Sequence, residues 1–531
     1  MSDRKTGGDE GTQGRSQPRH GWLPPFLLFL SLHPYEGASM SRTCLLLSVL
    51  ALGASAFGQD LSANLSVRDT VLANGLRVLV HRDTSVPSVS CRLFYATGSV
   101  HEHPGNTGIA HMLEHMLFKG TRKVGVTDST QDAVWLPLID SLNDRRREAL
   151  GRGDSASAKR FKTEMDSAAA HHRKVFIKDE LWQALRERGG TGLNAFTTDV
   201  GTAYFVTLPP SQVESYFWLE SDRMQNAVMR DFYAERDVVR EERRLRYENR
   251  PDGRYWESLE RMFWEANPLG NPTIGWPSDI ENYDRKMVEE HYKRYYGPQN
   301  AVLVLCGNVT PEAAFQLAVR YFGPIARGAD FPPIVTRDPE PAGQKRLVVA
   351  RDQARPRVDI LFQTPAVRDS LAPVMEVISG LLSGNSGRLH EVLVDSLRLS
   401  TGADADHWAQ NYASVLHIRA TPAPGADPAR LEAEIWKAIA RLRTEPVSPR
   451  ELTRVRNQVA MSKLRQMRDM ESVATELGFD AIYGDWNLVN SFPAAVQKVT
   501  AAQVREVAAK FLLPERATVG TLTAKSSEEA R

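Results

Sequence analysis

The sequence predicts an α+β fold made of two similar domains. The chain has 531 residues, more than one hydrophobic core usually holds. Short apolar runs typical of strands occur together with longer segments of helical periodicity. The order of these segments in the second half also resembles their order in the first, although few individual residues match. A duplicated domain explains the length and this repeated order together.

The composition is that of a globular protein, with 42% hydrophobic and 25% charged residues. A net charge of +1 predicts no general attraction to nucleic acid or to anionic membranes, so we expect no nucleic-acid partner. Of three cysteines, only Cys91 and Cys306 lie beyond the N-terminal segment. This count excludes a disulfide framework and favours two buried thiols, while a single bridge stays open.

The N-terminal segment has the pattern of a secretory signal. Met40-Ser41-Arg42-Thr43 precedes an apolar run from Cys44 to Ala56, which ends in Ala54-Ser55-Ala56. We therefore expect residues 40–56 to be a signal peptide and residues 1–39 to be untranslated or disordered; a buried N-terminal helix is the alternative. Because no later stretch is long and apolar enough to span a membrane, the mature chain is expected in the periplasm or outside the cell.

The first elements are two strands and a helix. Leu76–His81 and Val89–Ala96 are apolar runs of strand length, and Ile109–Lys119 has helical periodicity without Pro or Gly. This helix contains His111-Met112-Leu113-Glu114-His115, which is the H-x-x-E-H order.

A metal site explains these three ionisable residues best. On a helix His111 and His115 lie one turn apart on one face, with Glu114 beside them. Two imidazoles so placed can hold one Zn²⁺, and a neighbouring carboxylate can deprotonate a water on it. The alternative is a chance pattern of surface histidines. The otherwise apolar helix argues against it, because buried ionisable groups are costly without a partner.

Two segments of different character follow. Residues 128–180 are rich in charged residues and alanine, and a break at Gly151–Ser155 predicts a hairpin of two exposed helices. A Gly-rich stretch then leads into the strand Thr202–Leu208. Within that stretch Asn194 and Ala195 are expected on a strand whose free edge could pair with an extended peptide. An ordinary Gly-rich hairpin is the alternative.

The helix predicted over Glu235–Glu248 supplies further acidic residues. Glu235 and Glu242 are seven positions apart and share one helix face. A zinc held by two histidines needs a third protein ligand, which Glu242 can supply, while Glu235 can orient that ligand or the water. A charged, solvated helix face is the alternative.

The remaining elements complete the two domains. We expect the metal-binding domain over 68–325, a Pro-rich linker over 326–345 and a second domain over 346–525. The further helices and strands of the first domain are Ser211–Met229, Arg254–Glu265, Asp284–Tyr296, Ala301–Cys306 (a strand) and Pro311–Phe322. In the second domain they are the strands Arg346–Ala350, Val358–Gln363 and Ala517–Thr521 and the helices Leu371–Leu382, Arg430–Leu442, Glu451–Met467, Glu471–Gly484 and Ala501–Phe511.

The second domain lacks the metal residues. When Met375–Gly384 is aligned with His111–Gly120, the three positions of the motif fall on Met375, Ile378 and Ser379. Likewise, Glu242 falls on Gln458. The duplication therefore predicts one copy with a metal set and one without.

With these motifs in hand, the chain resembles the pitrilysin/insulinase family of zinc peptidases, the inverzincins that include mitochondrial processing peptidase. The resemblance extends from about Arg68 to Thr523. It rests on four stretches taken together: Thr107–His115 with Phe118–Thr121, Asn194–Thr197, Glu235–Glu242 and the strand Ala301–Asn308.

The resemblance implies a fold and a site. The fold would be two similar domains, each a mainly antiparallel sheet packed with helices. One Zn²⁺ would bind to His111, His115 and Glu242, with Glu114 as general base and Glu235 assisting. The peptide substrate would lie as an added strand beside Asn194-Ala195, in a chamber closed by a second pair of domains. The expected function is a zinc endopeptidase for unfolded or short peptides. The alternative is a non-catalytic structural or assembly subunit of a processing-peptidase-like complex, although the complete metal set favours the enzyme.

Two departures from the family matter. The stretch between His115 and Glu242 is longer than in relatives, and the surplus corresponds to 128–180, so we expect the insert to leave the site intact. Active relatives also use an Arg and a Tyr from a C-terminal-type domain to bind substrate and oxyanion. Here the Arg position falls on Leu393 or Val394 and the Tyr position on Ser400 or Thr401. We therefore expect a second peptidase-like chain to supply the pair, or a homodimer.

Overall fold

The computed structural model describes residues 64–525, and the described residues belong to one compact unit. The expected signal peptide at 40–56 and the extension at 1–39 lie outside this range. Within it, no helix combines the length and the apolar character needed to cross a bilayer.

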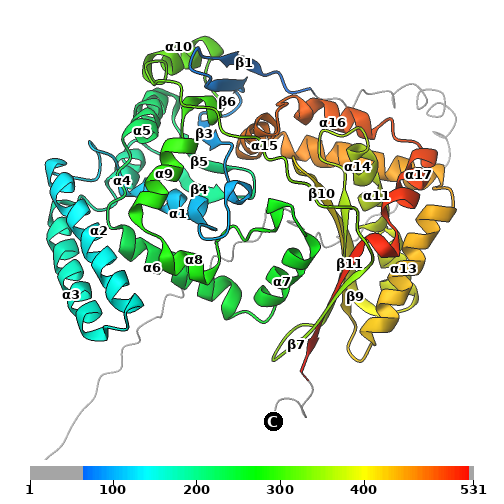
Figure 1. The fold of residues 1–531 in the computed structure, drawn as a ribbon. Coiled ribbons are helices and arrows are strands. Elements are labelled where there is room, and N and C mark those ends of the chain that lie inside the picture. Colours follow the sequence, from blue (N-terminus) through cyan, green and yellow to red (C-terminus); the bar gives the residue numbers. More distant parts are fainter. Residues whose placement is uncertain (1–63, 526–531) are drawn as a thin grey trace, which may run out of the picture. The chain divides into compact units, whose positions relative to one another are not determined.

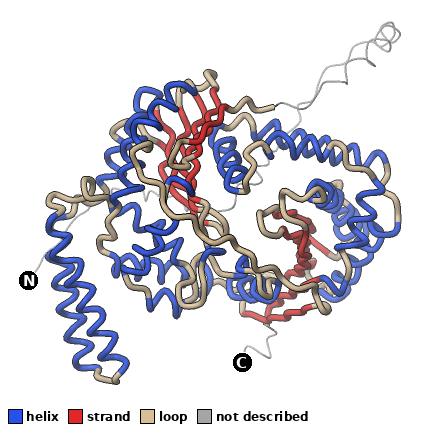
Figure 2. Tube along the Cα trace, turned by 45° about the horizontal axis from the view of Figure 1, so that its top comes forward, coloured by secondary structure: helices blue, strands red, loops and turns tan. Residues whose placement is uncertain are grey.

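Two mainly antiparallel sheets organise the described residues and form the two groups of strands in Figure 2. The first sheet has the order β1-β2-β6-β3-β5-β4 and the second the order β7-β11-β8-β10-β9. The strands are β1 (Arg68–Val71), β2 (Arg77–Arg82), β3 (Val89–Tyr95), β4 (Thr191–Thr197), β5 (Thr202–Leu208), β6 (Ala301–Gly307), β7 (Lys345–Arg351), β8 (Arg357–Thr364), β9 (Ser400–Trp408), β10 (Ser414–Pro422) and β11 (Ala517–Ala524).

The two sheets share one topology. β2 pairs parallel with β6, and the remaining neighbours of β2-β6-β3-β5-β4 are antiparallel. The second sheet repeats this pattern, because β7 pairs parallel with β11 and the other neighbours are antiparallel. The predicted α+β fold with a duplicated, mainly antiparallel domain is therefore confirmed, and β1 is an addition to the first copy only.

The helices follow the predicted order closely (Figure 1). The helix predicted over Ile109–Lys119 is an α-helix to Met116 that continues as a 3-10 turn, and the predicted hairpin of the insert is the pair α2 and α3. The α-helices are α1 (Ile109–Met116), α2 (Thr130–Gly151), α3 (Ser155–His172), α4 (Glu180–Arg186), α5 (Val213–Asn226), α6 (Phe232–Arg243), α7 (Gly253–Phe263), α8 (Pro277–Asn282), α9 (Arg285–Tyr295), α10 (Pro311–Tyr321), α11 (Ala372–Leu382), α12 (Arg388–His390), α13 (Pro428–Thr444), α14 (Pro449–Gln466), α15 (Met470–Ile482), α16 (Leu488–Val496) and α17 (Ala501–Phe511).

Each half of the chain contributes a helix to the sheet of the other half. α15 packs on β3 and β6 of the first sheet, where Leu477 joins Phe94 and Val304 in one apolar cluster. Gly478 permits this approach, since a Cβ there would lie 2.0 Å from the Phe94 ring. In the opposite direction α7 packs on β7 and β11 of the second sheet. The two sheets are therefore joined by α7 and α15 as well as by the segment between β6 and β7.

The two cysteines of the described residues are buried free thiols, as predicted. Cys91 on β3 belongs to the core on one face of the first sheet, and Cys306 on the neighbouring β6 belongs to the core on the other face. Side chains on opposite faces of a sheet cannot be bridged, so the single disulfide left open by the sequence is excluded.

Candidate metal centre

Helix α1 presents three ionisable side chains from an otherwise apolar helix. Its apolar residues Ile109, Met112, Leu113 and Met116 are buried in the core of the first sheet. The helix begins after Gly108, which has a positive φ of 88° that favours glycine. The buried carboxylate of Glu102 accepts hydrogen bonds from the backbone N–H groups of Gly108 and Ala110 and so satisfies the first turn.

Helix α6 brings a carboxylate to the same place. The Oε2 atom of Glu242 lies 3.4 Å from Nε2 of His115 and 3.8 Å from Nε2 of His111. One ligand atom from each of these residues lies within 4.8 Å of the other two. Elsewhere in the described range, no other three histidine, cysteine or carboxylate side chains converge in this way. The structure thus brings together the three residues that the sequence predicted as ligands.

The donor set fits a zinc ion. Ligand atoms that each lie about 2.0–2.2 Å from one zinc are separated by less than about 4.5 Å, so these side chains need only small adjustments. Burial lowers the pKa of His111 to about 3, and its Nδ1 atom has no hydrogen-bond partner. His111 is therefore the neutral imidazole that a metal requires.

His115 is held by carboxylates. Burial opposes its charge, but hydrogen bonds to Glu235 and Glu242 outweigh this effect and raise the pKa of His115 to about 9. Nδ1 of His115 lies 2.9 Å from Oε1 of Glu235, and Oε2 of Glu235 lies 2.5 Å from Nζ of Lys119. Glu235 therefore fixes the ring orientation of His115, whereas the sequence predicted that it would orient Glu242 or the water. Binding of a metal to Nε2 would displace the proton that Nε2 carries.

Glu114 lies beside this cluster. In the described structure its side chain forms no hydrogen bond with His111, His115 or Glu242. The Oε2 atom of Glu114 accepts a hydrogen bond of 2.6 Å from Thr197 on β4. Burial raises the pKa of Glu114, and the Thr197 hydroxyl opposes this increase. A carboxyl group with a raised pKa is suited to proton transfer near neutral pH.

Asn194 and Ala195 lie on β4, an edge strand of the first sheet. Ala195 is buried in the core, whereas Asn194 lines a cavity of about 530 Å³ that also contacts Glu114 and His115. The apolar wall of this cavity includes Phe118, whose ring stacks on Trp182 with centroids 5.3 Å apart. The cavity therefore connects the edge strand to the metal centre.

The second domain has no comparable centre among its described residues. Helix α11 buries Met375, Ile378 and Ser379, and the Ser379 hydroxyl donates to the backbone oxygen of Ala405. Gln458 on α14 is exposed and accepts from Arg454. These are the positions that the alignment placed opposite the motif of α1 and opposite Glu242, so the copy keeps the helices and lacks the ligands.

The positions expected for the Arg and Tyr carry other side chains. Leu393 is fully buried in a π-helical turn, and the Ser400 hydroxyl contacts the backbone oxygens of Gly402 on β9 and Thr421 on β10. Neither side chain projects a cation or a phenol toward a substrate.

The insert is fastened to the metal-binding domain by buried ion pairs. Asp132 of α2 accepts from Arg230 and from His172, and all three are almost fully buried. Arg230 also donates to the backbone oxygens of Lys119 and Thr121, in the loop that follows α1. The insert therefore supports the loop next to the site and is more than a solvated excursion.

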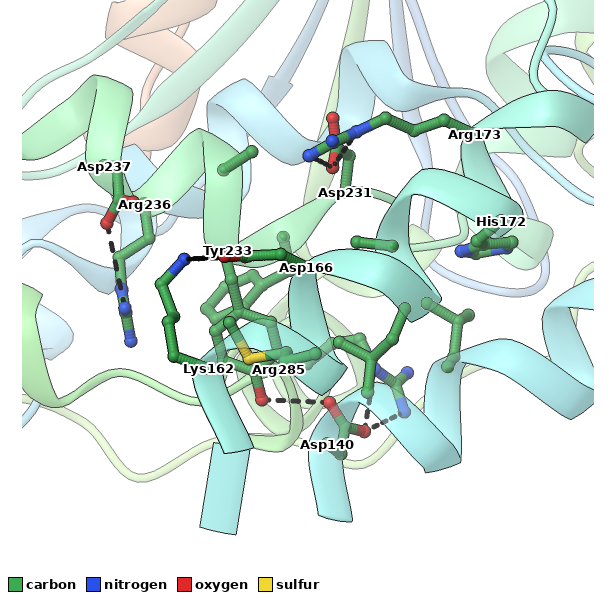
Figure 3. A pocket seen from close by; sticks show the side chains of 16 residues that line it. Asp140, Lys162, Asp166, His172, Arg173, Asp231, Tyr233, Arg236, Asp237 and Arg285 are labelled. Carbon is green, nitrogen blue, oxygen red and sulfur yellow. Dashed lines mark hydrogen bonds and ion pairs between the residues drawn. The ribbon is translucent and has the colours of Figure 1, made fainter. Parts of the chain in front are cut away.

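A cavity of about 220 Å³ lies between α2, α3 and α6 (Figure 3). The charged side chains around it are paired with one another. The pairs are Asp140 with Arg285, Lys162 with Asp166, Arg173 with Asp231, and Arg236 with Asp237. Tyr233 of α6 also donates to Asp140. Two of these pairs, Asp140 with Arg285 and Arg173 with Asp231, join the insert to the rest of the first domain. The cavity therefore lies at the junction between the insert and that domain.

Sequence reasoning missed three residues that contact the site. Lys119 follows His115 by four positions, and Arg246 follows Glu242 by four, so helical spacing could have found both. Nη2 of Arg246 lies 2.8 Å from Oε1 of Glu242. No sequence signal links Thr197 to Glu114, because they lie on different elements 83 residues apart.

Comparisons with known proteins lead to one family of peptidases. The family described as insulinase (peptidase family M16) matches residues 77–130, which include the motif of α1. The description "peptidase M16 inactive domain" matches residues 282–459, which include α11 and most of α14. The chain is 27% identical over 446 residues to a protein from Helicobacter pylori named zinc protease PqqE, covering 81% of this chain and 88% of the relative.

Solved structures share the fold. A protease from Helicobacter pylori superposes with a TM-score of 0.72 at 22% identity, covering 86% of this chain and 99% of the other. The first half of the periplasmic protease PqqL from Escherichia coli superposes with a TM-score of 0.66 at 16% identity, covering 87% and 92%. Motif, duplicated fold, ligand geometry and relatives agree: the chain belongs to the pitrilysin/insulinase family of peptidases, family M16.

Proposed function

We propose that this protein is a zinc-dependent endopeptidase that cleaves unfolded or short peptides. The observation that carries the proposal is the convergence of His111, His115 and Glu242 beside the buried carboxyl group of Glu114. Zinc bound by these ligands would polarise the scissile carbonyl group and acidify the attacking water.

The side chains around the ligands have separate tasks in this proposal. Glu114 takes the proton of the water as general base and passes it to the leaving amine as general acid. Thr197 holds one oxygen of Glu114. Glu235 and Lys119 keep His115 in the orientation that presents Nε2.

The edge strand β4 favours a peptide as the substrate. An extended peptide can add to a free sheet edge by main-chain hydrogen bonds, which requires a backbone that is not already folded. The cavity beside Asn194 has room for a side chain next to the cleaved bond. Ala195 adds little side-chain bulk to the strand, because its methyl group is buried in the core.

A second peptidase-like chain, or a second copy of this one, is part of the proposal. Val238 on α6 and Leu245 in the helical turn that follows it are 50% and 58% exposed and flank Glu242 in the sequence. A partner that covers these two side chains could also supply the Arg and Tyr that Leu393 and Ser400 do not provide. Light scattering of the purified protein, with and without the candidate partner, tests this. Full-rate peptide cleavage by a monomer would contradict it.

We also propose that the chain is exported. The signal-like segment at 40–56 supports this, as does the description of one structural neighbour as a periplasmic protease. N-terminal sequencing of material from the cell envelope or medium should find a start close to Phe57.

The deciding experiment compares wild type with Glu114→Gln. We expect about 10²- to 10⁴-fold slower cleavage of a quenched peptide, because general acid–base catalysis is lost. Zinc content should stay the same, since Glu114 is not a ligand. The candidate partner chain is present in the assays of both the wild type and the variant. Bound zinc without cleavage by wild type in any combination would favour the alternative, a structural subunit that does not turn over substrate.

A further inference from the structure

Several arginines flank Glu242 where α6 ends. Arg240, Arg243 and Arg244 pair with carboxylates that are not metal ligands. Arg246, in the π-helical turn Arg244–Glu248, is different. Its Nη2 atom lies 2.8 Å from Oε1 of Glu242, so this cation contacts a ligand residue directly.

The two oxygens of Glu242 therefore face different partners. Oε2 faces Nε2 of His111 and of His115, while Oε1 faces the guanidinium of Arg246. The spacing suits this contact, because a glutamate four residues before a cation on a helix is a favourable pair. A guanidinium also keeps its charge at any pH at which the protein is folded.

We propose that Arg246 is a positioning residue that holds Oε1 of Glu242 away from the metal. The role rests on the proposed function, because it concerns the zinc that His111, His115 and Glu242 would bind. A carboxylate can bind a metal through one oxygen or through both. With Oε1 held by Arg246, only Oε2 is presented, and one coordination position stays open for water and substrate.

Arg246 has little reason to be present for stability alone. Its side chain is 58% exposed, and exposed ion pairs contribute little to folding. Glu242 is much less exposed, at 18%. What Arg246 adds is a fixed direction for one oxygen.

The test is Arg246→Gln in protein loaded with Co²⁺ in place of zinc. Four-coordinate Co²⁺ absorbs visible light much more strongly than five-coordinate Co²⁺. Once Oε1 is free to bind, the visible absorption of R246Q should fall several-fold. R246K keeps the charge and should restore part of the wild-type intensity.

Arg244→Gln is the matched control. Arg244 is 55% exposed and pairs with Glu241 at 2.7 Å in the same helical turn, without touching a ligand residue. R244Q should keep the wild-type spectrum, and the melting temperatures of all variants should agree closely. A wild-type spectrum in R246Q would overturn the role of Arg246. Failure of the wild type itself to bind Co²⁺ or zinc would overturn the metal centre and this role together.

Discussion

At the scale of single residues, the site is defined by how each side chain is oriented. His111 is neutral because it is buried, and His115 is oriented because Glu235 accepts from its Nδ1 atom. Glu235 is in turn held by Lys119, and these two hydrogen bonds outweigh the effect of burial and lower the pKa of Glu235 to about 2. The chain Lys119–Glu235–His115 thus fixes the orientation of the imidazole, as a metal ligand would require.

Replacing Glu235 by Gln should therefore weaken zinc binding by about 10- to 100-fold, because the amide cannot stabilise the ring as a carboxylate does. Competition with a metal-binding dye measures this affinity. Glu241→Gln is the control, since Glu241 lies on the same helix and pairs with Arg244 instead. Equal zinc affinity in E235Q and E241Q would show that Glu235 does not act on the ligand.

At the scale of elements, the insert acts through α2. One face of this helix carries Asp132 and Asp140, which are buried against the metal-binding domain. Arg230 joins Asp132 to the loop after α1, and that loop includes Lys119. The insert therefore contributes to the support of α1, although it supplies none of the three candidate ligands.

Arg230→Met should lower the free energy of unfolding by about 3–5 kcal/mol, because it leaves the buried Asp132 without its main counter-charge. Urea unfolding monitored by circular dichroism gives the value. Arg152→Met is the control: Arg152 forms an exposed pair with Glu148 on α2, and its loss should cost less than about 1 kcal/mol. Similar losses in the two variants would show that the buried cluster does not anchor the insert.

At the scale of the whole molecule, the two halves share buried polar groups as well as apolar surface. Asp359 on β8 is fully buried and accepts hydrogen bonds from Tyr255 of α7 and from His417 and Arg357 of the second sheet. Burial opposes the charge of Asp359, but the bonds from His417 and Arg357 outweigh it and lower its pKa to about 2. This cluster lies where α7 packs on the second sheet.

The low pKa of Asp359 predicts how stability depends on pH. Because the folded pKa is below the ordinary value of 3.8, the contribution is present above about pH 4. It is lost as the pH falls toward 2, and it amounts to about 2 kcal/mol. Asp359→Asn should therefore be less stable than wild type at pH 7, with the difference shrinking between pH 4 and 2. Asp237→Asn, with an exposed side chain, should parallel the wild type. A constant difference for D359N across this range would rule out the linkage.

The sequence by itself determined much of the site, because the relevant spacings are local. His111, Glu114 and His115 fall on one helix, and Glu235 and Glu242 share a face of another, so helical geometry alone sets their relations. The strands richest in Val, Ile and Leu were also predictable, because a short apolar run is a local pattern as well. β9 and β10 were not predicted: β9 contains Gly402, Asp404 and Asp406, which have low strand propensity, and becomes a strand by pairing with β10.

Only the tertiary structure decided which groups meet across the chain. Thr197 reaches Glu114, Asp132 reaches Arg230, and α7 and α15 each cover the sheet of the other half. It also decided that Cys91 and Cys306 face opposite sides of one sheet, and that the two oxygens of Glu242 face different partners. Local periodicity places residues on a face of one element. Contacts between distant elements depend on how those faces bury apolar surface together, which no short stretch of sequence specifies.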